Sequence, residues 1–343
     1  MNRITKISFE GEKIAINGKP TYEGRYFEGK LVEGLLFNVR AVQAIFDDEN
    51  PETRELWRYP DTNRWDPDRN TEEFVKALPM WKEKGVLGFT VNLQGGMPVL
   101  HREFSQPWVN TAFKPDGNLK AAYLNRLQTV LDAADRLGMV VIVGLFYFGQ
   151  DERLESEQAV INGVRNVIEW LLEKEYQNVI VEINNECDIP AYEHDILRPH
   201  RVSELILYAK EIIASSSHRL HLPVSTSFSG GKVPVPKVLE CGDVVLVHGN
   251  DQPPERIRQM VAEIRSNDIF KKRPKPIIFN EDSVDVLNLN AAFESYSSWG
   301  YYDQGFNNYR DGFQSPPVCW EINTEYKKRF FNRVAEITGY NVS

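Results

Sequence analysis

Residues 178–186 read NVIVEINNE, a run in which an apolar segment ends directly on asparagine and glutamate. Short, nearly continuous apolar segments are typical of strands in a parallel sheet, because helices bury both faces of such a sheet. A second run of this kind, KPIIFNED at 275–282, ends on Glu281 and Asp282. The two runs predict a parallel sheet that carries carboxylates at the carboxyl ends of its strands.

Apolar runs of this kind recur along the chain and alternate with amphipathic segments of helical period. The predicted strands are 35–39, 87–93, 140–146, 179–183, 224–227, 244–247, 277–279 and 300–303. The predicted helices are 71–84, 119–137, 155–174, 201–215, 253–267, 291–298 and 323–337. Eight such units predict a (β/α)8 TIM barrel. An open doubly wound sheet is the competing topology, but the chain lacks GxGxxG after its first strand and GxxxxGK[ST] anywhere, which disfavours the nucleotide-binding forms.

The chain has 343 residues, of which 42% are hydrophobic and 26% charged, so it can bury a large core. One barrel uses about 200 to 400 residues, and we therefore predict a single catalytic domain over 1–343. Residues 7–22 alternate in polarity and carry turn signals at Gly11-Glu12-Lys13 and Asn17-Gly18. They predict a short N-terminal β-hairpin, which with its flanks (1–30) would cap the barrel.

Charge and cysteine content restrict the possible partners. Forty basic against forty-nine acidic residues leave a net charge of −9, which repels phosphate backbones and anionic membranes and favours neutral or cationic ligands. Cys187, Cys241 and Cys319 form no CxxC pair, so neither a disulfide framework nor a zinc ribbon is expected. No signal peptide or membrane segment is recognisable, which predicts a cytoplasmic protein, or a secreted or periplasmic one whose signal was removed.

The carboxylates at the strand ends are the candidate catalytic groups. In this architecture the loops after the strands build the active site, and the longest of them are predicted at 46–70 and 94–117. Burial raises the pKa of a carboxyl group, and repulsion between two carboxylates keeps one of them protonated, so Glu186 and Glu281 could supply one acid and one base. Such a pair is the minimum equipment for glycoside hydrolysis, and the residues alone leave open which one would attack.

Asn185-Glu186 at the end of the fourth strand and Glu281 at the end of the seventh resemble the clan A glycoside hydrolases. These are retaining (β/α)8 enzymes that include cellulases, β-mannanases and β-galactosidases, and the segment INGKP at 16–20 is similar to the hairpin before their first strand. The resemblance implies that Glu186 is the general acid/base, that Glu281 is the nucleophile, and that Asn185 hydrogen-bonds the sugar 2-hydroxyl. Many members have proline after the acid/base and His-x-Tyr near the sixth strand. This chain has Cys187 and, at 248–250, HGN, which leaves the particular family and the sugar open.

Further substrate-binding candidates lie at predicted strand ends, because sugars need aromatic faces and polar side chains together. They are Arg40, Gln94, Gln150, Asp151, His248, Trp299 and Tyr301, and the aromatic residues Tyr147 and Tyr302 lie beside them in the sequence. Glu182 faces the barrel interior with Glu186, and we interpret it as a structural ion-pair partner of Arg40.

We predict a retaining glycoside hydrolase that cleaves a β-linked, neutral oligo- or polysaccharide. Two alternatives stay open: a barrel that binds carbohydrate without cleaving it, and a metal-dependent barrel hydrolase. The second is the weaker, because neither HxH nor HExxH occurs. No cofactor or metal is expected. Linkage, endo or exo action and oligomeric state do not follow from the residues.

Overall fold

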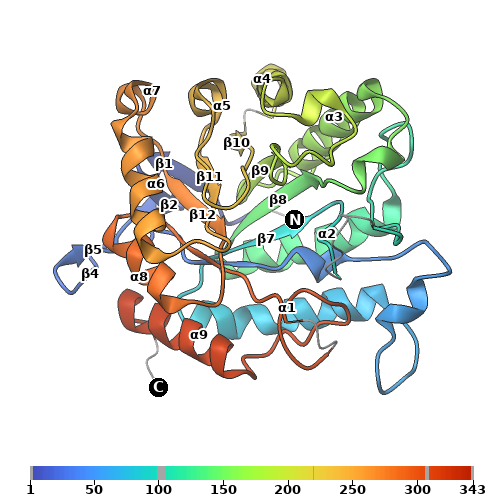
Figure 1. Cartoon of the computed structure of the whole chain (residues 1–343), viewed down its shortest axis with the longest axis horizontal. Coiled ribbons are helices and arrows are strands. Elements are labelled where there is room, and N and C mark those ends of the chain that lie inside the picture. The colour runs from blue at the N-terminus through green and yellow to red at the C-terminus, as the bar shows by residue number, and fades with distance from the viewer. Residues whose placement is uncertain (1–2, 99–105, 219, 306–308, 341–343) are drawn as a thin grey trace.

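Eight parallel strands form a closed barrel in the computed structural model, which describes residues 3–98, 106–218, 220–305 and 309–340. Figure 1 shows strands in the middle of the molecule with helices around them. The strands are β6 (Asn38–Arg40), β7 (Gly88–Asn92), β8 (Val140–Phe146), β9 (Val179–Asn184), β10 (Val224–Ser225), β11 (Val245–His248), β12 (Ile277–Glu281) and β13 (Gly300–Tyr301). Pairing runs β10-β9-β8-β7-β6-β13, and β11 pairs with β12. Backbone hydrogen bonds from Asp243 to Val224 (3.0 Å) and from Phe279 to Ser298 (2.9 Å) close the two gaps. The predicted (β/α)8 barrel is confirmed.

Helices surround the strands, as the apolar period predicts. They are α1 (Pro67–Glu83), α2 (Ala121–Leu137), α3 (Glu157–Glu173), α4 (Val202–Ser215), α5 (Pro236–Cys241), α6 (Pro254–Ser266), α7 (Asp268–Lys272), α8 (Val286–Glu294) and α9 (Glu325–Thr338). Short 3-10 turns lie at Val42–Ile45, Arg54–Trp57, Asp151–Arg153 and Asp195–Leu197. The helix predicted at 291–298 begins earlier, because the Asp285 side chain caps α8 by accepting from the Leu287 N–H. The short helices α5 and α7 were not predicted.

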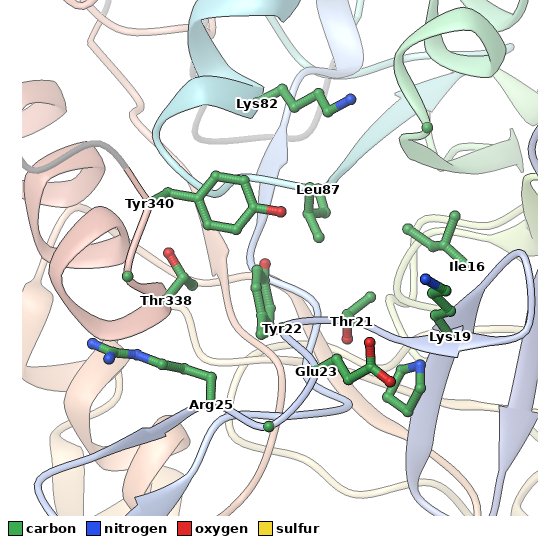
Figure 2. A pocket seen from close by; sticks show the side chains of 14 residues that line it. Ile16, Lys19, Thr21, Tyr22, Glu23, Arg25, Lys82, Leu87, Thr338 and Tyr340 are labelled. Carbon is green, nitrogen blue, oxygen red and sulfur yellow. The ribbon is translucent and has the colours of Figure 1, made fainter.

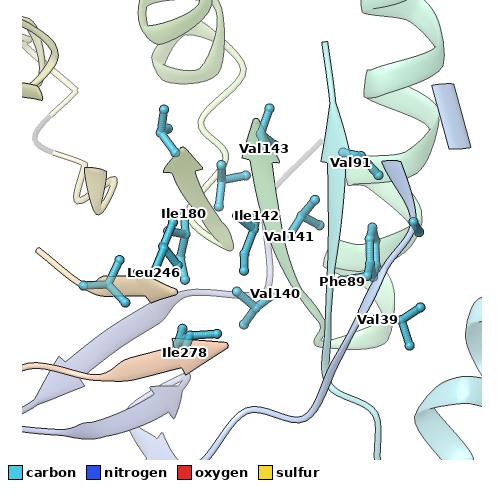
Figure 3. Close-up of a cluster of buried hydrophobic side chains, with 14 of the residues drawn as sticks. Val39, Phe89, Val91, Val140, Val141, Ile142, Val143, Ile180, Leu246 and Ile278 are labelled. Atoms are coloured by element: carbon cyan, nitrogen blue, oxygen red, sulfur yellow. The ribbon is translucent and has the colours of Figure 1, made fainter. Parts of the chain in front are cut away.

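The core lies between the strands and this helical layer. Every residue of β8 is buried, because alternate side chains face the barrel interior and the surrounding helices. Figure 3 shows the β8 side chains Val140–Val143 beside Phe89 and Val91 of β7. This continuous burial explains why the strands appear as unbroken apolar runs in the sequence.

The N-terminal segment forms a three-stranded antiparallel sheet of β1 (Ile7–Glu10), β2 (Lys13–Ile16) and β3 (Lys19–Pro20). The predicted hairpin is thus present, with Ile7 opposite Ile16, and gains a third strand. A small ribbon of β4 (Tyr26–Phe27) and β5 (Lys30–Leu31) follows. The Ile7 N–H donates to the Gln177 carbonyl (2.8 Å), just before β9 begins, so this sheet lies at the amino ends of the barrel strands.

A cavity of about 650 Å³ lies at the same end of the barrel (Figure 2). Its lining includes Tyr22 and Arg25 from the N-terminal segment, Lys82 of α1, and Tyr340. The Tyr22 hydroxyl donates to the Gly85 carbonyl (2.7 Å), which ties the segment to the end of α1. This cavity is therefore remote from the carboxyl ends of the strands. No helix in the described ranges combines the length and apolar character needed to cross a bilayer.

Candidate active site

Glu186 and Glu281 meet at the carboxyl ends of β9 and β12. Glu186 follows β9 in a left-handed backbone conformation (φ 49°), and its N–H donates to the Ser227 hydroxyl (3.0 Å) beyond β10. Glu281 is the last residue of β12. One side-chain oxygen of each glutamate and one ring nitrogen of His248 all lie within 4.8 Å of one another. The barrel thus brings together two carboxylates that are 95 positions apart in the chain (281 − 186 = 95).

Arg40, from the end of β6, lies beneath the pair and is buried. Its Nε contacts Glu281 Oε2, and its Nη2 donates to Asn185 Oδ1. Its Nη1 lies 3.9 Å from Glu182 Oε2, so the ion pair expected with Glu182 is present. Burial opposes the charge of Arg40, but Glu281 and Glu182 outweigh burial and raise its pKa. Arg40 therefore places a permanent positive charge against Glu281.

Asn250 supplies a second donor to Glu281. Its Nδ2 donates to Glu281 Oε1 at 2.7 Å. Asn250 was not among the predicted site residues, although it is the third residue of the HGN segment that distinguishes this chain from the resembled enzymes. Its position two residues after His248 was the available signal.

His248 lies between the two carboxylates, at the end of β11. Its Nδ1 is 2.9 Å from Glu186 Oε1 and 3.7 Å from Glu281 Oε2. Burial lowers the pKa of His248, so the ring is neutral at neutral pH. One proton then joins Nδ1 to Glu186: either the ring donates to the carboxylate, or the protonated carboxyl donates to the ring.

Glu186 differs from Glu281 in its surroundings. Burial raises the pKa of Glu186 from its ordinary value of 4.5 to about 7; Arg40 opposes this shift, Asp188 reinforces it, and Lys232 opposes it. Asp188 is itself paired with Lys232 (2.6 Å). Glu186 can therefore hold a proton near neutral pH, whereas Glu281 lies directly against a guanidinium. This asymmetry is what an acid and a nucleophile require.

Two buried tyrosines face the same carboxylates. Burial, with the charges of Glu281 and Glu186, raises the pKa of both Tyr147 and Tyr302. Tyr302 follows β13, and its hydroxyl donates to Gln314. It lies next to Tyr301 in the sequence, but consecutive side chains of a strand point to opposite sides, so only one of the two can face the barrel mouth.

The side chains of Trp299 and Tyr301 point away from the barrel mouth and lie in the core. The prediction that they bind sugar is therefore wrong. Tyr301 stacks on Phe330 of α9 with ring centroids 4.5 Å apart, and its hydroxyl donates to Asp303 (2.8 Å). Trp299 is fully buried, also near Phe330, and its indole N–H donates to Asp282 (2.7 Å). Neither ring is accessible to a substrate.

Gln94, Gln150 and Asp151 lie at predicted strand ends but are fully buried, and they join loops to one another. The Tyr147 N–H donates to Gln94 Oε1 (3.2 Å), and the Asn110 N–H donates to Gln150 Oε1 (2.9 Å). Asp151 Oδ2 accepts from the N–H groups of 193 and 194. These side chains hold the loops around the mouth in place, and the structure does not place them against a substrate.

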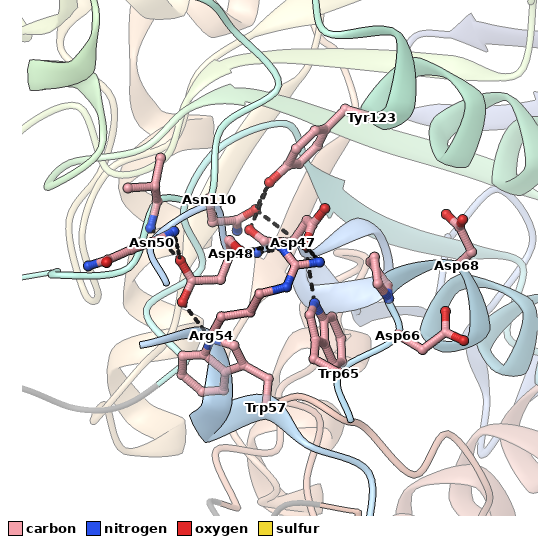
Figure 4. A network of polar contacts seen from close by, with 12 residues as sticks. Asp47, Asp48, Asn50, Arg54, Trp57, Trp65, Asp66, Asp68, Asn110 and Tyr123 are labelled. Carbon is pink, nitrogen blue, oxygen red and sulfur yellow. Dashed lines mark hydrogen bonds and ion pairs between the residues drawn. The ribbon is translucent and has the colours of Figure 1, made fainter. Parts of the chain in front are cut away.

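The loop after β6 is held by a polar network (Figure 4). Asp48 accepts from the Trp57 indole (2.8 Å) and from the Val109 N–H (2.9 Å), while Trp65 donates to Asp47 (3.2 Å). The Trp57 ring is buried and packs edge-on against Phe46 and Trp108. The two long loops predicted to form the cleft are therefore joined side by side; residues 99–105 of the second fall outside the described ranges.

Glu186, His248 and Glu281 are residue types that bind metals, and their ligand atoms are close enough to share one ion. Arg40, however, already lies against Glu281 Oε2, and its positive charge repels a divalent cation there. The donor set fits acid and nucleophile chemistry better than it fits a metal centre.

No family model matches the sequence, and no curated protein matches it. Solved structures described as glycoside hydrolases share the barrel fold of this chain. The endo-1,4-β-mannanase of Rhizomucor miehei superposes with a TM-score of 0.58 at 13% identity, over 98% of this chain and 100% of that one. The β-glucosidase of Thermotoga maritima gives a TM-score of 0.56 at 10% identity, over 90% of this chain and 99% of the other.

A Bacteroides vulgatus protein, provisionally described as a glycoside hydrolase, gives a TM-score of 0.61 at 13% identity over 96% of this chain. This chain spans only 60% of the length of that protein. The likeness to clan A barrels expected from residues 185, 186 and 281 is confirmed at the level of fold.

Proposed function

We propose that this protein is a retaining glycoside hydrolase that cleaves a β-linked glycan or oligosaccharide. The fold is shared with enzymes described as a mannanase and a glucosidase, and two glutamates lie where such a barrel carries its active site. The proposal assigns Glu186 as general acid/base and Glu281 as nucleophile, with Arg40, Asn185, His248 and Asn250 as the polar groups around them.

In the first step, Glu281 attacks the anomeric carbon and forms a glycosyl ester. The bond from that carbon to the leaving oxygen breaks, and the leaving oxygen takes the proton of Glu186. The raised pKa of Glu186 keeps this proton available near pH 7. Arg40 and Asn250 hold Glu281 in place by contacts to its two oxygens.

In the second step, water attacks the anomeric carbon and the ester bond to Glu281 breaks. Glu186, now a carboxylate, takes a proton from that water and so returns to its starting state. His248 Nδ1, 2.9 Å from Glu186, keeps the carboxyl group oriented in both steps. Two displacements at one carbon retain the configuration of the sugar.

The separation of the two carboxylates is the observation that carries the proposal. Retaining enzymes hold the two groups about 5–5.5 Å apart, whereas inverting enzymes hold them about 6.5–9.5 Å apart to admit a water. Here one oxygen of Glu186 and one of Glu281 lie within 4.8 Å of each other. The two carboxylates are thus close enough for the retaining arrangement, which supports direct attack by Glu281.

The test is hydrolysis of aryl β-glycosides and β-linked oligosaccharides, with the first product anomer read by proton NMR. We expect the β-anomer first. Glu186→Gln should lower kcat/KM on oligosaccharides by about 10²–10⁴-fold, and much less on nitrophenyl glycosides, whose leaving group needs no proton. Glu281→Gln should abolish both activities.

Glu193→Gln is the matched control, because Glu193 is exposed and lies in the loop after the same strand as Glu186. The activity of this variant should equal that of the parent. The α-anomer as first product would reject the retaining mechanism. Saccharide binding by the parent without turnover of any substrate would favour the carbohydrate-binding barrel instead.

A further inference from the structure

A cavity of about 540 Å³ adjoins the candidate active site. It lies between the loops that follow β11, β12 and β13 and the first turn of α9. Its lining includes Asn250, which donates to Glu281, and Tyr302, which faces both carboxylates. An occupant of this cavity would therefore lie beside the reacting centre.

The cavity is acidic. Five carboxylates line it, and no lysine, arginine or histidine occurs among its described lining residues: Asp251, Asp282, Asp303, Asp311 and Glu325 are the acids. Glu325 is paired with Lys328 (2.9 Å). Burial raises the pKa of Asp282 to about 6, and its two oxygens accept from Asn288 and Trp299.

Asp251 and Asp303 also line the cavity, and neither forms an ion pair within 4.0 Å in the described part of the chain. Asp303 accepts neutral hydrogen bonds from the Tyr301 hydroxyl and the Gly305 N–H. The buried ammonium of Lys327 interacts electrostatically with Asp303, but it donates to the Cys319 carbonyl and to Asn323, and it does not line the cavity. The cavity therefore keeps a negative potential.

An exposed aromatic ring forms part of the wall. Tyr326, in the first turn of α9, lines the cavity and is 54% exposed, although most large apolar side chains of the chain are buried. An accessible ring beside carboxylates can stack on the C–H face of a sugar while the carboxylates accept from its polar groups.

We propose that this cavity is a sugar subsite and that the sugar it takes carries a protonated amino group. The inference rests on the proposed glycosidase function and refines the neutral saccharide expected from the sequence. Lys327 offsets part of the charge of Asp303 from outside the cavity, but no cation that lines the cavity faces Asp251 or Asp303. A neutral sugar adds no positive charge there, whereas an ammonium group beside the two carboxylates forms charge-assisted hydrogen bonds. The substrate class is then a β-linked glycan that contains amino sugars.

Calorimetric binding of two matched tetrasaccharides to Glu186→Gln protein tests this inference. One is β-1,4-linked glucosamine and the other β-1,4-linked glucose, which share ring shape and linkage and differ at C2. At mildly acidic pH the amino sugar should bind about ten-fold more tightly in about 0.02 M salt, and this advantage should shrink in about 0.5 M salt as screening shortens the range of the cavity charge.

Three further substitutions in that background identify the source of the preference. Asp251→Asn should reduce the amino-sugar advantage about three-fold and leave the glucose tetramer unchanged. Asn tolerates the positive φ of residue 251 (58°), so the backbone should not change. Tyr326→Ala should weaken both ligands about five-fold, because a stacking face is lost. Glu173→Gln, at the far end of α3, removes the same charge and should change neither.

Equal affinity for the two tetramers, or no binding of either, would overturn the inference. An equal effect of Asp251→Asn on both ligands would do so too. Parallel turnover assays with the parent separate the two proposals. If the parent hydrolyses β-glycosides without preferring amino sugars, the subsite proposal fails and the glycosidase proposal stands. If amino sugars bind in a manner that depends on Asp251 but nothing is hydrolysed, the subsite proposal stands and the glycosidase proposal fails.

Discussion

Glu186 combines two features that a general acid needs. It is held by a backbone contact to Ser227, which sets its position, and its side chain is only 13% exposed, so that burial raises its pKa to about 7. Glu281 is held differently, by side-chain contacts from Arg40 and Asn250. The two glutamates are chemically identical in the sequence, and their neighbours alone distinguish their proposed roles.

The raised pKa of Glu186 predicts a specific dependence of stability on pH. Folded Glu186 keeps its proton between about pH 4.5 and 7, whereas the unfolded chain releases it. Its stabilising contribution is therefore complete below pH 4.5 and is lost as pH rises to about 7. Over this window the parent should lose on the order of 3 kcal/mol relative to Glu186→Gln, measured by urea unfolding at a series of pH values.

Glu193→Gln serves again as the control, and its difference from the parent should stay flat across the same window. Activity of the parent should also decline as pH rises through about 7, because Glu186 loses the proton it donates. A pH-independent difference between the parent and Glu186→Gln would show that Glu186 titrates normally.

The strands decide which side chains reach the interior of the barrel. Gly144 of β8 faces Asn92 of β7, and a methyl group added at Gly144 would collide with Asn92 Oδ1. Asn92 is buried, and its side-chain amide has no hydrogen-bond partner within the described residues. The glycine therefore leaves room for a polar side chain beneath the candidate active site.

Gly144→Ala should lower the free energy of unfolding by about 1–3 kcal/mol, because the added methyl group overpacks the barrel interior. The double variant Asn92→Ala/Gly144→Ala should lose less than the sum of the two single variants, since the colliding group is gone. Urea unfolding of the four proteins measures this coupling. Additive losses would mean that the two positions do not compete for space.

The whole barrel is braced at the end opposite the candidate site. Asp135, at the end of α2, accepts from the backbone N–H groups of Ile4 (3.1 Å) and Thr5 (2.8 Å) and so holds the chain just before β1. It is almost fully buried. The N-terminal sheet thus belongs to the stability of the barrel, while the loops at the other end carry the candidate chemistry.

Asp135→Ala should lower the free energy of unfolding by about 1–3 kcal/mol, because two N–H groups lose a charged acceptor. Turnover at a temperature well below the unfolding transition should stay within about two-fold of the parent, since the two ends of the barrel do not touch. Asp135→Asn keeps one acceptor oxygen and should cost less. A loss of turnover in folded Asp135→Ala protein would contradict this separation of the two ends.

The apolar periodicity was sufficient to predict the eight barrel strands, most of the helices and the glutamates at two strand ends, because burial on both faces of a strand leaves a local pattern in the sequence. That 1–343 acts as one catalytic domain stays a prediction. Positions such as Gln94 and Trp299 show the limit of this reasoning. Both follow the expected pattern, yet each side chain points into the core, because a shift of one residue along a strand reverses its direction.

The geometry of the candidate active site was decided only by closure of the barrel. Arg40, Glu186, His248 and Glu281 come from four strands far apart in the chain, and no local pattern encodes the distances between them. The contact of Asn250 with Glu281, the choice of Tyr302 over Tyr301, and the acidic cavity beside them all depend on how the loops pack after closure. The sequence determined the residue types of the site. Their mutual distances follow from the tertiary structure, and their protonation follows from the burial and charges that this structure creates.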